Sequence, residues 1–140
     1  MTPTTSREPV EDLAYPKRIL VVEDDEEMSD TLCEALTDHG YEPVAAANGQ
    51  EALERLRAWP EPPSVILLDL AMPVLDGRAF RDAQLAEPEL RDIPVIVLTA
   101  QPDAEQLCAQ MEVNAFLRKP VGLDPLLTLI RRHADTTTWA

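Results

Sequence analysis

Five short apolar runs recur along the chain, and they constrain the fold more than any other feature of its sequence. Each run has the length of a β-strand, and their positions are 18–22, 43–47, 64–69, 93–99 and 115–119. Within the runs, apolar residues follow one another instead of alternating with polar residues. Strands with this pattern are buried on both faces, which is typical of a parallel sheet. The sequence therefore predicts a parallel sheet with helices on both sides.

The segments between the runs carry the pattern of amphipathic helices, with apolar residues at helical spacing. In the first helix these residues are Met28, Leu32, Ala35 and Leu36, in the fourth Ala104, Leu107, Cys108 and Met111, and in the last Leu123, Leu126, Leu127, Ile130 and Ala134. The stretch 38–40 indicates a helix end, with Gly40 as a left-handed cap. Alternation of strand and helix predicts a doubly wound α/β domain with right-handed crossovers.

Length and composition are those of one domain. The chain has 140 residues, of which 45% are hydrophobic, and this suffices for a single sizeable core. Residues 1–16 are rich in Thr, Pro and Glu and lack apolar periodicity, which predicts a flexible N-terminal leader. We expect the domain over residues 17–134 and a short C-terminal tail over 135–140.

The chain is strongly acidic. Its 26 Asp and Glu residues outnumber its 12 Lys and Arg residues, and the formal net charge is −14 at pH 7. Neutralising the phosphates of nucleic acid or of anionic lipid requires a basic face. The charge therefore argues against both partners and favours proteins or cations.

The cysteines and the N-terminal segment indicate the cellular compartment of the protein. Cys33 and Cys108 are far apart, lie in helical contexts and have no CxxC spacing, which favours buried, reduced thiols. The N-terminus lacks the apolar core of a signal peptide, and no segment reaches the roughly 18 apolar residues of a membrane span. We therefore expect an intracellular protein of the cytoplasm.

Acids, a hydroxyl and an amine stand where the predicted strands end. Five consecutive acids, Glu23 to Glu27, follow the first strand, and Asp69, Thr99 and Lys119 end the third, fourth and fifth strands. Adjacent negative charges repel one another, so the acids indicate either a solvated helix-starting turn or a site at which a cation offsets the repulsion. In doubly wound sheets, functional residues gather at the carboxyl ends of the strands. We therefore expect these side chains to converge on one rim.

In combination, four motifs resemble the receiver domain of two-component response regulators, the CheY-like family. They are VVEDDE after the first strand, ILLDLAMPVLDG around the third, VIVLTA at the fourth and AFLRKP at the fifth. The resemblance covers residues 17–134. It implies a flavodoxin-like (CheY-like) fold, that is, a doubly wound five-stranded parallel sheet with strand order 2-1-3-4-5.

The resemblance implies that Asp69 is a phospho-acceptor, which receives a phosphoryl group from a histidine kinase or phosphotransfer protein. Transfer to a carboxylate among other carboxylates needs a divalent cation, and Mg²⁺ suits a site of few carboxylates with water. The implied ligands are Asp24, Asp25, Asp69 and the backbone carbonyl of Ala71. Glu23, Glu26 and Glu27 are interpreted as helix-start acids, which the helix dipole favours.

The residues around the last two strands also have roles by resemblance. Lys119 pairs with Asp69 before transfer and with the phosphoryl oxygen afterwards. Thr99 donates a hydrogen bond to the phosphoryl group and acts as a switch residue with Phe116, although an aromatic residue on a strand is also typical of plain core. A cis peptide bond is expected before Pro120.

Two positions depart from the pattern of the family. Ala71 and Gln101 border the path of a hydrolytic water, and a polar residue is common in the family at the first of these positions. Neither side chain can act as a general base. We therefore expect both residues to tune the lifetime of the phosphoryl group, toward slow hydrolysis.

The resemblance implies a signalling protein that catalyses only its own phosphorylation and dephosphorylation. We expect a stand-alone receiver that binds a downstream protein through its fourth helix, fifth strand and fifth helix, residues 102–134. One alternative is a receiver-like protein-binding module that works without phosphorylation. Another is an aspartyl-phosphate phosphohydrolase, which needs a second Asp where this chain has Ala71.

Overall fold

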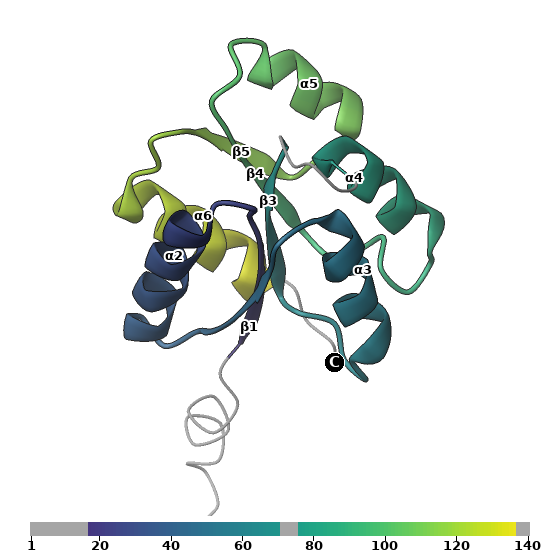
Figure 1. Cartoon of the computed structure of the whole chain (residues 1–140), viewed down its shortest axis with the longest axis horizontal. Coiled ribbons are helices and arrows are strands. Elements are labelled where there is room, and N and C mark those ends of the chain that lie inside the picture. The colour runs from purple at the N-terminus through teal and green to yellow at the C-terminus, as the bar shows by residue number, and fades with distance from the viewer. Residues whose placement is uncertain (1–16, 71–75, 137–140) are drawn as a thin grey trace, which may run out of the picture.

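A five-stranded parallel sheet forms the centre of the computed structural model, which describes residues 17–70 and 76–136 (Figure 1). The strands are β1 (Arg18–Val22), β2 (Glu42–Ala46), β3 (Val65–Asp69), β4 (Val95–Thr99) and β5 (Ala115–Arg118). Their order is β2-β1-β3-β4-β5, and all neighbouring pairs are parallel. The predicted fold class and strand order are confirmed.

Helices cover both faces of the sheet (Figure 1). They are α2 (Glu26–Asp38), α3 (Gly49–Ala58), α4 (Gly77–Ala86), α5 (Ala104–Met111) and α6 (Leu123–Thr136). Helices α2 and α6 share one hydrophobic core with the sheet, and α3, α4 and α5 share the other. Helix α6 extends past residue 134, at which the domain was predicted to end. In the described parts of the chain, no helix combines the length and the apolar character needed to cross a membrane.

The central strands supply both cores, which explains why their apolar residues follow one another. In β1, Leu20 and Val22 contribute to the core beneath α3, α4 and α5, whereas Ile19 and Val21 contribute to the core beneath α2 and α6. Strands β3 and β4 are buried along their whole length, while the edge strands β2 and β5 contain half-buried and exposed residues. Strands buried in this way hold their terminal residues in defined positions.

Side chains cap the start of three helices. Asp25, Asn48 and Asp76 each accept a hydrogen bond from the backbone N–H three residues later. Helix α2 ends at Asp38, and Gly40 has a φ of +89°, as predicted for a left-handed cap. The capping residues therefore determine where α2, α3 and α4 begin.

A buried arginine joins α4 to the end of α5. Arg81 is 5% exposed, and it donates to the backbone carbonyls of Met111 (3.1 Å) and Glu112 (2.6 Å). It also donates to Oε1 of Gln84 at 2.7 Å. Because the last carbonyls of a helix have no partner within the helix, these bonds fix the C-terminal end of α5 against α4.

Candidate functional site

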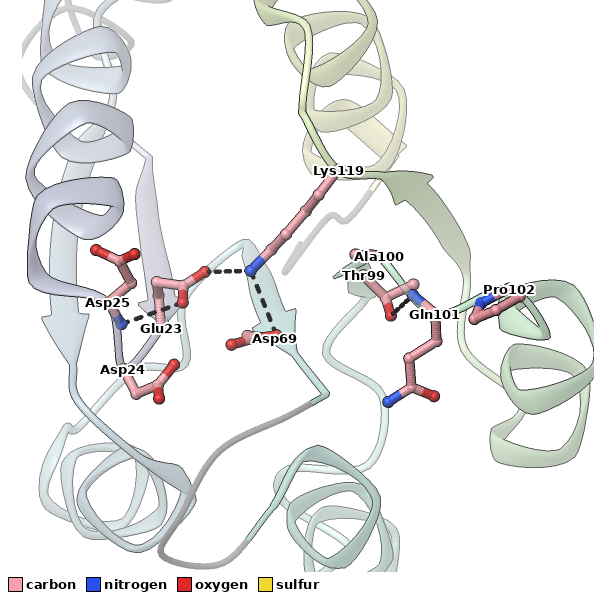
Figure 2. A pocket seen from close by; sticks show the side chains of 9 residues that line it. All are labelled: Glu23, Asp24, Asp25, Asp69, Thr99, Ala100, Gln101, Pro102 and Lys119. Carbon is pink, nitrogen blue, oxygen red and sulfur yellow. Dashed lines mark hydrogen bonds and ion pairs between the residues drawn. The ribbon is translucent and has the colours of Figure 1, made fainter.

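A polar pocket lies at the carboxyl end of the sheet (Figure 2). The described residues that line it are Glu23, Asp24, Asp25, Asp69, Thr99, Ala100, Gln101, Pro102 and Lys119. They end or follow β1, β3, β4 and β5, because parallel strands all deliver their last residues to the same edge. The fold thus brings residues from four separate parts of the sequence into one site.

Lys119 joins two buried carboxylates in this pocket. Its Nζ lies 3.1 Å from Oε1 of Glu23 and 3.5 Å from Oδ1 of Asp69, and Figure 2 shows the side chain reaching between them. Asp69 is 5% exposed and Glu23 is 3% exposed, so the ammonium group offsets charges that are costly to bury. Burial lowers the pKa of Lys119, but the charges and hydrogen bonds of Asp69 and Glu23 outweigh burial and raise the pKa above its ordinary value. Lys119 is therefore charged at neutral pH.

The position of Glu23 corrects its interpretation as a helix-start acid. Helix α2 begins after it, at Glu26, and the Glu23 side chain points into the pocket. Besides its contact with Lys119, Oε2 of Glu23 accepts a hydrogen bond from the backbone N–H of Asp25 at 3.2 Å. Glu23 is therefore a site residue that the sequence analysis missed.

The alternation of side chains along a strand accounts for the position of Glu23. Strands β1 and β3 pair in register, with Val21 beside Leu67 in the same core. Side chains two residues apart in a strand lie on the same face, so the next positions on this face are Glu23 and Asp69. Counting alternate positions along the strand from Val21 to Glu23 could therefore have identified Glu23 from the sequence.

Three carboxylates form a group that could hold a metal ion. Oxygens of Glu23, Asp24 and Asp69 all lie within 4.8 Å of one another. Carboxylate oxygens are hard donors, and a site with few of them leaves the remaining positions of an octahedral ion to water or phosphate oxygen. The chemistry of this donor set fits Mg²⁺.

Asp25, which was predicted to be a metal ligand, does not belong to this group. Its Oδ1 accepts a hydrogen bond from the backbone N–H of Met28 at 3.1 Å, which makes Asp25 the N-cap of α2. The set of acids therefore differs by one position from the predicted pair of Asp24 and Asp25, with Glu23 in place of Asp25. The predicted backbone ligand at Ala71 lies outside the described residues.

Thr99 is oriented by the segment that follows it. The residue is 2% exposed, and its Oγ1 accepts a hydrogen bond from the backbone N–H of Gln101 at 3.1 Å. The hydroxyl hydrogen can then be donated to another acceptor. The carbonyl of Thr99 accepts a hydrogen bond from the N–H of Lys119 at 2.9 Å. This bond joins the end of β4 to the residue after β5.

Phe116 and Pro120 lie on either side of Lys119 in the sequence. The Lys119–Pro120 peptide bond is cis, as predicted. Phe116 is half-buried and packs against the core beneath α5. This position is compatible with plain core and with the predicted switch role, which stays a prediction.

Gly77, at the start of α4, lies directly behind the end of β3. A Cβ atom at this position would lie 2.8 Å from the carbonyl oxygen of Asp69 and 2.8 Å from Cα of Leu70. The N–H of Gly77 also donates to the carbonyl of Leu70 at 3.1 Å. A side chain at position 77 would therefore displace the end of β3, a constraint that no local sequence pattern indicates.

The fold and the pocket together define a class of doubly wound α/β domain whose acidic centre combines carboxylates with a lysine and a hydroxyl. Comparison with known protein families identifies which family within this class the chain matches. The family described as the response regulator receiver domain matches residues 19–131. The chain belongs to this family, as the resemblance of its motifs predicted.

Named relatives include longer regulators. The response regulator MprA of Mycolicibacterium vanbaalenii is 34% identical over 125 residues, which is 88% of this chain and 52% of the relative. The phosphate regulon transcriptional regulatory protein PhoB of Escherichia coli is 34% identical over 118 residues, 82% of this chain and 50% of the relative. The chain therefore spans about half the length of these two regulators.

Solved structures with the same fold include receiver domains of histidine kinases. One, from a signal transduction histidine kinase of Syntrophus aciditrophicus, is 30% identical with a TM-score of 0.79, over 89% of this chain and 94% of that chain. Another, from the sensor histidine kinase PA1611 of Pseudomonas aeruginosa, is 30% identical with a TM-score of 0.78, over 86% of this chain and 99% of that chain. The latter was determined with a magnesium ion coordinated in its active site cleft.

Proposed function

We propose that the chain is a phosphorylation-dependent signalling switch in which Asp69 accepts a phosphoryl group from a histidine kinase or phosphotransfer protein. The observation that carries this proposal is the position of Asp69 in the pocket, where its Oδ1 lies 3.5 Å from Nζ of Lys119. Two further carboxylates, Glu23 and Asp24, stand within 4.8 Å of Asp69. Membership of the receiver family supports the same reaction class.

In the proposed transfer, an Asp69 oxygen attacks the phosphorus of the donor's phosphohistidine. A new O–P bond forms as the P–N bond breaks, and the imidazole nitrogen leaves with the electron pair. Lys119, which contacts Asp69 in the resting protein, then pairs with a phosphoryl oxygen. Thr99 directs its hydroxyl hydrogen to another phosphoryl oxygen, because its Oγ1 already accepts from Gln101.

Mg²⁺ would be held by Glu23, Asp24 and Asp69, with the backbone carbonyl of Ala71 as a further ligand implied by the family. When bound, it neutralises negative charge at the reacting oxygens. The grouping of the three carboxylate oxygens supports this assignment, as does the magnesium ion in the cleft of the PA1611 receiver. Asp25 caps α2 in this scheme, so that the first turn of the helix is correctly formed beside the pocket.

The downstream protein would bind the face made by α5, β5 and α6, which corresponds to residues 102–134. This face begins at the loop after Thr99 and includes Phe116. A change in the conformation of either side chain on phosphorylation would therefore alter the face. Gln101 lines the pocket, and its neutral amide cannot act as a general base toward water. With Ala71, it would make hydrolysis of the acyl phosphate slow.

Labelling with a small phosphodonor tests the reaction. Wild type, Asp69→Asn and the control Asp82→Asn, which changes an exposed aspartate of α4, are incubated with acetyl phosphate in Mg²⁺ or EDTA. We expect a mass increase of one phosphoryl group in wild type and Asp82→Asn, in Mg²⁺ only, and none in Asp69→Asn. Equal labelling of Asp69→Asn would refute the assignment. Absence of labelling in wild type would favour the phosphorylation-independent binding module.

A further inference from the structure

Arg118, the last residue of β5, lies outside the pocket but contacts Gln101, which lines it. Its Nη1 donates a hydrogen bond to the backbone carbonyl of Gln101 at 3.0 Å. Its guanidinium also lies over the ring of Phe116, with Cζ 5.9 Å from the ring centroid. Arg118 thus contacts the loop that follows β4 although it does not line the pocket.

The backbone of Gln101 is held on two sides by side chains of paired residues. Thr99 and Arg118 are partners in the register between β4 and β5. Thr99 Oγ1 accepts from the N–H of Gln101 at 3.1 Å, and Arg118 donates to its carbonyl at 3.0 Å. Figure 2 shows Gln101 beside Thr99 at the edge of the pocket, connected by the first of these bonds.

The bond from Gln101 to Thr99 determines how the threonine hydroxyl is directed. Because Oγ1 accepts from Gln101, the hydroxyl hydrogen is directed away from that N–H. This direction depends on the position of the Gln101 backbone. The Gln101 carbonyl also accepts a longer hydrogen bond from the backbone N–H of Ala104, at 3.3 Å. The side chains around it add little, because Ala100, Pro102 and Asp103 are exposed and the Asp103 side chain makes no capping hydrogen bond to α5.

We propose that Arg118 is a positioning residue for phosphoryl transfer. Together with the N–H of Ala104, it fixes the carbonyl of Gln101, which keeps the Gln101 N–H on Thr99 and so restricts the directions in which the threonine hydroxyl can donate to a phosphoryl group. This inference rests on the proposed function and extends it to a side chain outside the pocket. Arg118 is exposed, so its replacement leaves no buried cavity and is not expected to unfold the chain.

The first experiment compares rates of phosphorylation by acetyl phosphate. Arg118→Met keeps an apolar side chain over Phe116 but removes the donor, and should slow the reaction about threefold to tenfold, as loss of one exposed intramolecular hydrogen bond predicts. Arg118→Lys, which retains a cationic donor, should restore most of the rate. Arg91→Met, which removes an exposed charge from the segment before β4, controls for the effect of net charge on an anionic donor. Equal rates for wild type and Arg118→Met would overturn the proposal.

A double-mutant cycle distinguishes positioning of Thr99 from any other effect of Arg118. In the Thr99→Ala background there is no hydroxyl to direct, so Arg118→Met should have little further effect on the rate. An undiminished effect in that background would overturn the proposed route through Thr99.

A third measurement does not depend on the phosphoryl reaction. Hydrogen exchange of the Gln101 amide in the unphosphorylated protein should be faster in Arg118→Met than in wild type or Arg118→Lys. Unchanged exchange at Gln101 would overturn the inference even if Asp69 is phosphorylated. Faster exchange in a chain that cannot be phosphorylated would support the contact and refute the proposed function alone.

Discussion

Removal of one charge at Glu23 and at Asp25 should affect Mg²⁺ binding differently, although the two acids are separated by a single residue. Glu23→Gln removes a carboxylate oxygen that lies within 4.8 Å of those of Asp24 and Asp69. Asp25→Asn removes the same charge from the N-cap of α2, and Asn is an equally good cap. The two variants therefore separate metal binding from helix capping.

The expected magnitude follows from the charges and their burial. Two unit charges 4 Å apart interact by about 4 kcal/mol at an effective dielectric constant of 20, and by about 1 kcal/mol in bulk water. Glu23 is 3% exposed and would face a divalent ion, whereas desolvation and the competing ammonium of Lys119 offset part of the attraction. We expect Glu23→Gln to lose at least about 1.4 kcal/mol, a tenfold increase in Kd. For the exposed Asp25→Asn we expect less than about a threefold change.

Titration with MgCl₂, followed by backbone amide NMR shifts at the pocket, measures the Kd of wild type and both variants. Thermal unfolding of each variant without metal is the control that it is folded. Asp25→Ala should also lose the cap, at a cost of about 1 kcal/mol in the free energy of unfolding. If Asp25→Asn weakens binding more than Glu23→Gln, Asp25 is the ligand and the reassignment is wrong.

Other positions give outcomes for packing and thiol chemistry. Gly77→Ala should lower the free energy of unfolding by about 1–3 kcal/mol and slow phosphorylation, because its Cβ would clash with the end of β3; unchanged urea unfolding would contradict this contact. Arg81→Ala should lose about 2–4 kcal/mol in the same assay, whereas the exposed Arg78→Ala should lose less than about 0.5 kcal/mol. Burial raises the pKa of Cys33 and Cys108, which lowers the thiolate fraction at pH 8, so iodoacetamide should alkylate the folded protein more slowly than the protein in guanidinium.

Much of the fold could be predicted from the sequence because the strands of a parallel sheet are buried on both faces. The apolar runs that end at Val22, Asp69 and Thr99 match observed strands to within two residues at either end. The order of the strands was not available from periodicity, since each run could pair with any other. It came from the resemblance of the motifs to the receiver family, and the pairing of the strands confirmed it.

The candidate site was predictable where one polar residue ends a strand, and less so where several acids follow one another. Asp69 and Thr99 each stand alone at the end of an apolar run, so their place at the carboxyl edge followed directly. Lys119 follows Arg118, and the motif AFLRKP identified which of the two cations belongs to the site. After β1, the choice among consecutive acids depended on which side chain faces Asp69. The resemblance to the receiver family implied Asp24 and Asp25, whereas alternation along the strand places Glu23 beside Asp69.

The constraints at Gly77 and Arg118 could not be read from the sequence for a different reason. Each acts on a residue that is distant along the chain, Gly77 on the carbonyl of Asp69 and Arg118 on that of Gln101. No local pattern encodes such a distance. A glycine at a helix start and an arginine at a strand end have ordinary explanations, and only the packing of the elements reveals the contacts that these two residues make.

The charge balance of the pocket connects the stability of the resting protein with its reaction. In the group formed by Glu23, Asp24, Asp69 and Lys119, three negative charges and one positive charge leave a formal charge of −2. Asp25, which lines the same pocket and caps α2, adds one more negative charge. Lys119 reduces the cost of burying Glu23 and Asp69, but the remaining charge repels an anionic phosphoryl donor. One divalent cation would bring the formal charge of this group of four residues to zero, and the proposed transfer of a phosphoryl group to Asp69 would then add negative charge beside Lys119 and the hydroxyl of Thr99. In the proposed function, the same residues would therefore permit a buried acceptor at rest and make its phosphorylation depend on a divalent cation.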